Sequence, residues 1–150
     1  MIIEEHNALR RQEFAANMQE MVWNEDLAEM AAGVVSRCKA DHSEWNSRVG
    51  KSGFAYSGES IFWAWVRWNM TAVVRNLHDE KPHYRYLSNT CHLRDNSALT
   101  DCGHYTQIVW AKTCSVGCAY SFCDYIINGG NITSGFMVVC KYGPGLDYNP

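Results

Sequence analysis

In the first half of the chain, apolar residues recur at the spacing of an α-helix in three segments. The clearest segment follows Asn24, a favoured N-cap residue, and its acidic first turn Glu25–Asp26 suits the positive end of a helix dipole. Its apolar positions are Leu27, Met30, Ala31, Val34, Val35 and Cys38. Weaker helical patterns run from Ile2 to Leu9 and from Trp63 to Leu77. The first half is therefore predicted to be mostly helical.

Beyond Gly103 the hydrophobic period changes to two, which is typical of strands. Apolar and small residues alternate from Val116 to Phe122, and the segments Tyr105–Trp110 and Phe136–Tyr142 are rich in β-branched and aromatic residues. The asparagine and glycine residues of Asn128–Asn131 fit a hairpin connection. Helices from one half of the chain and adjacent strands from the other predict an α+β fold.

The cysteine content indicates an extracellular protein. Seven cysteines in 150 residues are unusual in a reducing cytosol and common in secreted domains. Two acceptor triplets, which begin at Asn69 and Asn131, predict N-glycosylation and point to the same compartment. The sequence opens without a basic and apolar leader, so we expect it to represent a mature domain over residues 1–150.

Charge and hydropathy narrow the classes of partner. The net charge is -3, and lysine and arginine are scattered singly, so the chain lacks the basic stripe that nucleic acids require. The longest apolar stretch, near Ile61–Val66, is far shorter than the roughly 20 residues of a membrane-spanning helix. We therefore expect no nucleic-acid partner and no transmembrane segment.

Two segments carry a resemblance to a known family. GHYTQIVW at residues 103–110 resembles the signature of the CAP superfamily, which includes cysteine-rich secretory proteins, venom antigen 5 and group 1 pathogenesis-related proteins of plants. FMVVCKYGPG at 136–145 resembles the second signature of the family, and His6, Asn7 and Arg10 resemble its opening helix. The resemblance covers nearly the whole chain. It implies a single CAP domain, a three-layer α-β-α sandwich with a central antiparallel sheet.

The resemblance also implies a cleft where two histidines and two acids meet. CKADHS at 38–43 assigns the first histidine to His42, and GES at 58–60 assigns the first acid to Glu59, with a serine where the family usually has asparagine. LHDE at 77–80 assigns the second acid to Glu80, although a leucine replaces the tryptophan that leads this motif. GHY at 103–105 assigns the second histidine to His104. The neighbouring histidines His78 and His83 are expected at the surface.

Imidazole nitrogens and carboxylate oxygens are ligands that Zn²⁺ accepts, so these four residues form a candidate site for Zn²⁺ or another divalent cation. The affinity of such a site should fall at acid pH, because protons compete for the imidazole nitrogens. The alternative is a polar network that only fixes the fold.

The pairing of six cysteines has fifteen solutions, which spacing alone does not resolve. The family resemblance implies the disulfides Cys38–Cys123, Cys91–Cys102 and Cys118–Cys140. Cys114 is then left over, either as a buried thiol without function or as a covalent route to a homodimer.

Two classes of function fit these features. The first is a secreted, non-enzymatic binding module for an extracellular protein or for an apolar ligand such as a sterol or fatty acid, with the immune-modulating or venom-allergen-like roles of the family. Trp63, Trp65 and Trp68 are candidates for the apolar site, and core packing is the alternative. The second is a metal-dependent hydrolase, a protease or esterase, with Glu59 or Glu80 activating water. The chain has neither a Gly-x-Ser-x-Gly nor a His-Glu-x-x-His motif, which favours the first class.

Overall fold

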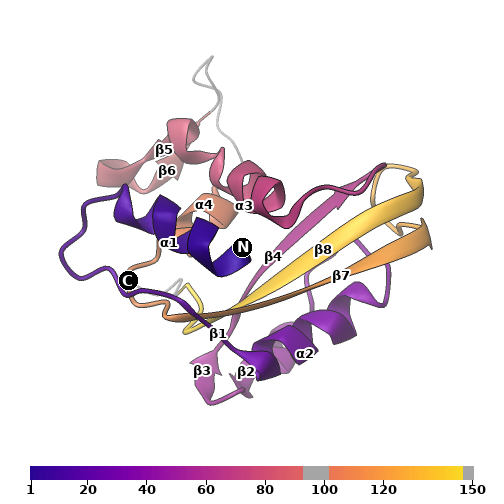
Figure 1. Ribbon diagram of the computed structural model, residues 1–150, viewed down its shortest axis with the longest axis horizontal. Helices are drawn as coiled ribbons and strands as arrows, with labels where there is room; N and C mark the ends of the chain where they lie inside the picture. The colour runs from indigo at the N-terminus through magenta and orange to yellow at the C-terminus, as the bar shows by residue number, and fades with distance from the viewer. Residues whose placement is uncertain (93–101, 147–150) are drawn as a thin grey trace.

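The computed structural model describes residues 1–92 and 102–146. A four-stranded sheet forms the middle layer, with strand order β1-β7-β8-β4. Helices α1, α3 and α4 lie over one face of the sheet and α2 lies over the other (Figure 1). The predicted α+β sandwich is therefore confirmed. The sheet strands are β1 (Val22–Trp23), β4 (Gly58–Ala64), β7 (Ser115–Tyr125) and β8 (Thr133–Gly143), and the α-helices are α1 (Ile2–Arg11), α2 (Glu25–Val35), α3 (Met70–His78) and α4 (Gly103–Ile108).

The sheet is mixed rather than purely antiparallel. Strands β4, β7 and β8 pair antiparallel, whereas the two residues of β1 pair parallel to the start of β7. Smaller elements lie outside this sheet. They are the strand pairs β2 (Val49–Lys51) with β3 (Phe54–Tyr56) and β5 (Tyr84–Arg85) with β6 (Thr90–Cys91), and the short helices η1 (Trp45–Ser47), η2 (Lys81–His83) and η3 (Tyr86–Ser88).

Alternate residues of β8 divide the core into two parts, because successive side chains of a strand point to opposite faces. Phe136, Val138, Cys140 and Tyr142 pack in the cluster beneath α1, α3 and α4. Met137 and Val139 pack with Ala31 and the last residues of α2 on the other face. Lys141 is the next residue on the α2 face, and it is buried there. A buried lysine in this apolar strand needs a partner of opposite charge, which is Glu59.

The helix predicted after Asn24 is present, and the Asn24 side chain accepts a hydrogen bond from the Leu27 amide at 3.0 Å. The helix predicted from Trp63 to Leu77 is wrong in its first part. Residues Gly58–Ala64 form strand β4, paired along its whole length with β8, and α3 begins only after Asn69. The short apolar run of β4 is compatible with the period of a helix and with that of a strand, and the pairing with β8 makes it a strand.

The strand expected at Tyr105–Trp110 is also wrong, because this segment carries α4. Its aromatic and β-branched side chains favour a strand intrinsically, but tertiary contacts override that preference. Arg10 is buried, and its Nη1 donates hydrogen bonds to the carbonyls of Ile108 and Trp110, at 2.8 Å each. The bond to Ile108 satisfies a carbonyl at the carboxyl end of α4, and the Trp110 carbonyl just beyond it also accepts from the Thr113 amide at 3.1 Å.

All three disulfides implied by the family resemblance are present, namely Cys38–Cys123, Cys91–Cys102 and Cys118–Cys140. Cys114 is a free, half-buried cysteine. Asn69 and Asn131 are both exposed, and their glycosylation stays a prediction. Within residues 1–92 and 102–146, no helix has both the length and the apolar character needed to cross a membrane.

Candidate functional site

The first histidine–acid pair joins the loop after α2 to strand β4. Glu59 lies on β4 directly opposite Lys141 of β8, and its side chain is fully buried. Its carboxylate accepts from the Ser43 amide at 2.8 Å and from the Ser43 hydroxyl at 2.7 Å, and it lies 2.6 Å from the Lys141 ammonium. The Nδ1 atom of His42 lies 2.9 Å from Glu59 Oε1. Glu59 therefore fixes both the loop and the His42 ring.

The charge of Glu59 is compensated inside the protein. Burial by itself raises the pKa of Glu59, but hydrogen bonds from His42, Lys141 and Ser43 and the Lys141 charge outweigh it and hold the pKa far below its ordinary value. Burial lowers the pKa of Lys141, and the Glu59 carboxylate opposes that shift. The pair is a buried ion pair, with the Lys141 ammonium also donating to the Ser43 hydroxyl at 2.9 Å.

The second pair joins the end of α3 to the start of α4. Glu80 follows α3, and its Oε1 lies 2.7 Å from Nδ1 of His104, the second residue of α4. The other oxygen of Glu80 accepts from the Tyr105 amide at 3.0 Å. The side chains of Glu80 and His104 are 25% and 33% exposed, so this pair is more accessible than Glu59.

The structure brings His42, Glu59 and His104 to one cavity of about 420 Å³, whereas Glu80 contacts His104 from outside the lining. The remaining lining residues are Trp45, Arg48, Tyr56, Gly58, Gly103, Gln107 and Leu146. Both carboxylates are bonded to histidine Nδ1 atoms. Among the described residues, no three histidine, cysteine, aspartate or glutamate side chains form a group suited to a metal ion. The hydrogen bonds from Nδ1 to the two glutamates orient the imidazole rings. The second nitrogen of each ring, Nε2, takes no part in these two bonds.

Sequence reasoning missed several residues of this cleft. Lys141 was a detectable signal, because one charged residue interrupts an apolar strand from Phe136 to Tyr142. Trp45, Arg48 and Tyr56 carried no comparable signal, since they lie in the short helix η1, directly after it and in the short strand β3, whose positions only the tertiary structure gives. The surface position predicted for His78 is wrong. Its ring packs edge-on against Tyr105 and is buried near Glu13.

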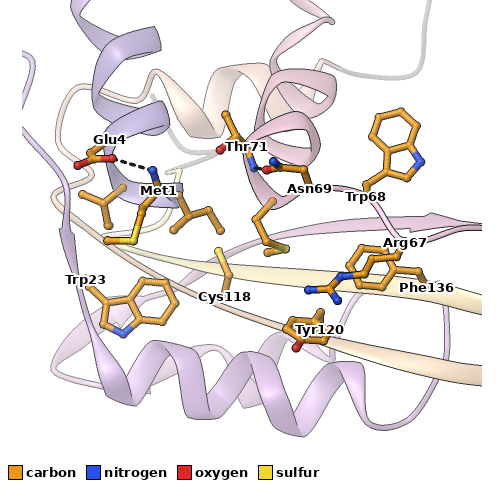
Figure 2. Close-up of a pocket in the computed structure, with 13 residues that line it drawn as sticks. Met1, Glu4, Trp23, Arg67, Trp68, Asn69, Thr71, Cys118, Tyr120 and Phe136 are labelled. Atoms are coloured by element: carbon orange, nitrogen blue, oxygen red, sulfur yellow. Dashed lines mark hydrogen bonds and ion pairs between the residues drawn. The ribbon is translucent and has the colours of Figure 1, made fainter.

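A second, larger cavity lies between α1, α3 and the sheet. Its volume is about 960 Å³, and most of its lining is apolar, with Ile2, Ile3, Met70 and Phe136 among the side chains. Figure 2 shows Trp23 and Trp68 at opposite ends of this cavity, with Arg67 beside Tyr120. Of the three tryptophans predicted for an apolar site, Trp68 lines this cavity. Trp63 and Trp65 do not line it and are 38% and 58% exposed.

Comparison with known proteins agrees with this architecture. A model of the CAP family, described as the cysteine-rich secretory protein family, matches residues 3–142. Peptidase inhibitor 16 of Bos taurus is 34% identical over 146 residues, which are 96% of this chain and 29% of that protein. GLIPR1-like protein 1 of Mus musculus is 34% identical over 143 residues, or 93% of this chain and 56% of that protein. The chain thus spans about a third to a half of these relatives.

A solved structure shows the same fold. Venom allergen-like protein 4 of Schistosoma mansoni superimposes with a TM-score of 0.74 at 25% identity, covering 97% of this chain and 87% of that one. The matched family region includes the first signature, residues 136–142 of the second, the three disulfides and the two histidine–glutamate pairs. The chain therefore belongs to the CAP family.

Proposed function

We propose that this chain is a secreted, non-enzymatic CAP protein whose cleft binds a divalent metal ion, Zn²⁺ in the first instance, through His42 and His104. The observation that supports the proposal is the pair of hydrogen bonds from histidine Nδ1 atoms to Glu59 and Glu80 at the edge of one cavity. A carboxylate bonded to one ring nitrogen fixes the tautomer of a metal-ligating histidine and raises its basicity. Two imidazole ligands would leave coordination positions for water or a further ligand.

The electrostatics of Glu59 favour binding over hydrolysis. A general base works best when its pKa lies near the operating pH, and the pKa of Glu59 is held far below its ordinary value. Both Glu59 oxygens are also engaged by Ser43, His42 and Lys141. These features make Glu59 a poor activator of water. Both oxygens of Glu80 are also engaged, by His104 and by the Tyr105 amide, so the binding role is proposed and the hydrolase stays the alternative.

Isothermal titration of chelator-stripped protein with Zn²⁺ tests the metal site. We expect micromolar or tighter binding in the wild type, loss of binding in the His42→Ala/His104→Ala variant, and weaker binding at about pH 5.5 than at about pH 7.4, because protons compete for imidazole nitrogen. His83→Ala is the matched control, since His83 lies outside the cleft lining. Unchanged Zn²⁺ binding in the double variant would overturn the proposal.

The second cavity supports a second binding role, for an apolar ligand such as a fatty acid or sterol. Its volume of about 960 Å³ lies within the range of small-molecule pockets, and its walls are mostly apolar. Titration with a fluorescent fatty acid tests this role. Met70→Arg places a charge in the lining and should abolish binding, whereas Trp65→Gln, outside the lining, should not change it. Equal binding by both variants would exclude this cavity as the ligand site.

A further inference from the structure

One wall of the histidine cleft is built from two aromatic rings and a guanidinium group. Trp45 and Tyr56 stack with ring centroids 4.4 Å apart and planes inclined by 24°. The guanidinium carbon of Arg48 lies 5.9 Å from the Trp45 ring centroid and 5.4 Å from that of Tyr56. Arg48 Nη1 also donates to the Tyr56 hydroxyl at 2.8 Å. These contacts among the three side chains hold the wall in a fixed shape. All three side chains line the same cavity as His42 and His104.

No carboxylate within residues 1–92 and 102–146 balances the positive charge of this wall. Arg48 forms no ion pair within the described part of the chain, and its Nε atom is buried without a hydrogen-bond partner there. The acid that lines the cavity, Glu59, is already paired with Lys141 at 2.6 Å. Among the described residues, the cleft therefore presents a cation without a carboxylate partner, a position that suits a bound anion.

Trp45 adds an apolar surface beside that cation. Trp45 lines the cavity and is 56% exposed. One face of the indole is covered by Tyr56, so the exposed area can contact a bound molecule. A cavity of about 420 Å³ is large enough for a small organic ligand.

We propose that this cleft binds a small organic anion, with its carboxylate or phosphate group against Arg48 and its nonpolar part packed on Trp45. The inference concerns the cleft of the proposed function but stands without the metal, because Arg48, Trp45 and Tyr56 need no metal to hold their positions. Arginine suits this task because its planar, permanently charged group pairs with both carboxylate and phosphate.

The test is an NMR chemical-shift titration of chelator-stripped protein with benzoate and with phenyl phosphate. Benzyl alcohol has the ring without the charge, and inorganic phosphate has the charge without the ring. We expect both aromatic anions to bind at least about tenfold more tightly than benzyl alcohol, which lacks the charge-assisted hydrogen bond to Arg48. They should also bind more tightly than inorganic phosphate, which has no ring to pack on Trp45. Equal binding of benzoate and benzyl alcohol would overturn the proposal. Preference for one aromatic anion identifies the carboxylate or the phosphate as the favoured group.

Variants separate the two contacts. Arg48→Gln should weaken benzoate binding at least about tenfold, whereas Arg48→Lys keeps the charge but loses the planar group and should bind with an affinity between those of the wild type and Arg48→Gln. Trp45→Ala should weaken the aromatic anions and leave inorganic phosphate unchanged. Arg85→Gln removes an exposed arginine outside the lining and is the matched control. If Arg48→Gln and Arg85→Gln have the same effect, the proposed site is wrong.

The same titration distinguishes this inference from the metal proposal. Anion binding by the stripped protein, together with no Zn²⁺ binding in calorimetry, would leave the anion site standing and refute the metal site. Zn²⁺ binding without any anion binding, in either the stripped or the Zn²⁺-loaded protein, would refute the anion site and leave the metal site standing.

Discussion

His6 provides a sharp test of how the buried core responds to pH. The ring is fully buried in α1, with Nδ1 2.8 Å from the Ile2 carbonyl oxygen and Nε2 3.1 Å from the Tyr142 hydroxyl. The carbonyl only accepts, so Nδ1 carries the proton and Nε2 accepts from Tyr142. Burial lowers the pKa of His6 from 6.5 to about 4, and the nearby Arg10 charge acts in the same direction. A second proton would place a positive charge in this buried position and would require the Tyr142 hydroxyl to change from donor to acceptor.

The direction of the effect follows from the two pKa values. Below pH 6.5 the unfolded chain gains a proton on His6 that the folded protein does not accept until about pH 4. The stabilisation is therefore complete above pH 6.5 and is lost as the pH falls towards 4. The difference corresponds to about 3 kcal/mol of unfolding free energy in total, of which about 2 kcal/mol is lost by about pH 5.

Urea unfolding with the disulfides intact measures this loss. Wild type and His6→Gln are compared at about pH 7.5 and about pH 5, with chelator present so that metal binding does not contribute. We expect the stability difference between them to shrink by about 2 kcal/mol at the lower pH. Leu9→Ala, a buried apolar truncation in the same helix, is the control and should cost about 2 to 5 kcal/mol at both pH values. An equal pH dependence in wild type and His6→Gln would refute the reasoning.

Two further predictions concern packing around the site. Lys141→Met leaves the Glu59 carboxylate buried without its cation and should lower the free energy of unfolding in urea by about 3 to 5 kcal/mol. The control Lys51→Met, at an exposed strand position, should change it by less than about 0.5 kcal/mol. A cost below about 1 kcal/mol for Lys141→Met would contradict the ion-pair argument. Gly117→Ala in β7 would place a Cβ 2.2 Å from a backbone nitrogen of α2 and should destabilise the protein by about 1 to 3 kcal/mol. Gly33→Ala within α2 adds a Cβ that meets nothing within 4 Å and should stabilise the protein by about 0.5 to 1 kcal/mol. Thermal unfolding compares the two variants, and equal effects would show that α2 can shift.

Local sequence was sufficient where the signal was local. The cap at Asn24 and the regular apolar spacing after it predicted α2, and the period of two predicted the long strand β7. It failed at β4 and α4, where intrinsic preference and tertiary contacts disagree. Trp63 belongs to a strand because β8 pairs with it, and Tyr105 belongs to a helix although its neighbours favour strands. The motifs of the family, rather than the spacing of residues, supplied the disulfide pairs.

The sequence by itself singled out the candidate site residues, because His42, Glu59, Glu80 and His104 lie in short motifs that resemble those of the family. The tertiary structure alone decided how they are used. The register of β4 against β8 places Glu59 opposite Lys141, and the packing of α4 beside the end of α3 turns Glu80 towards His104. Strand register and helix packing depend on contacts between segments far apart in the chain, so no local pattern encodes them.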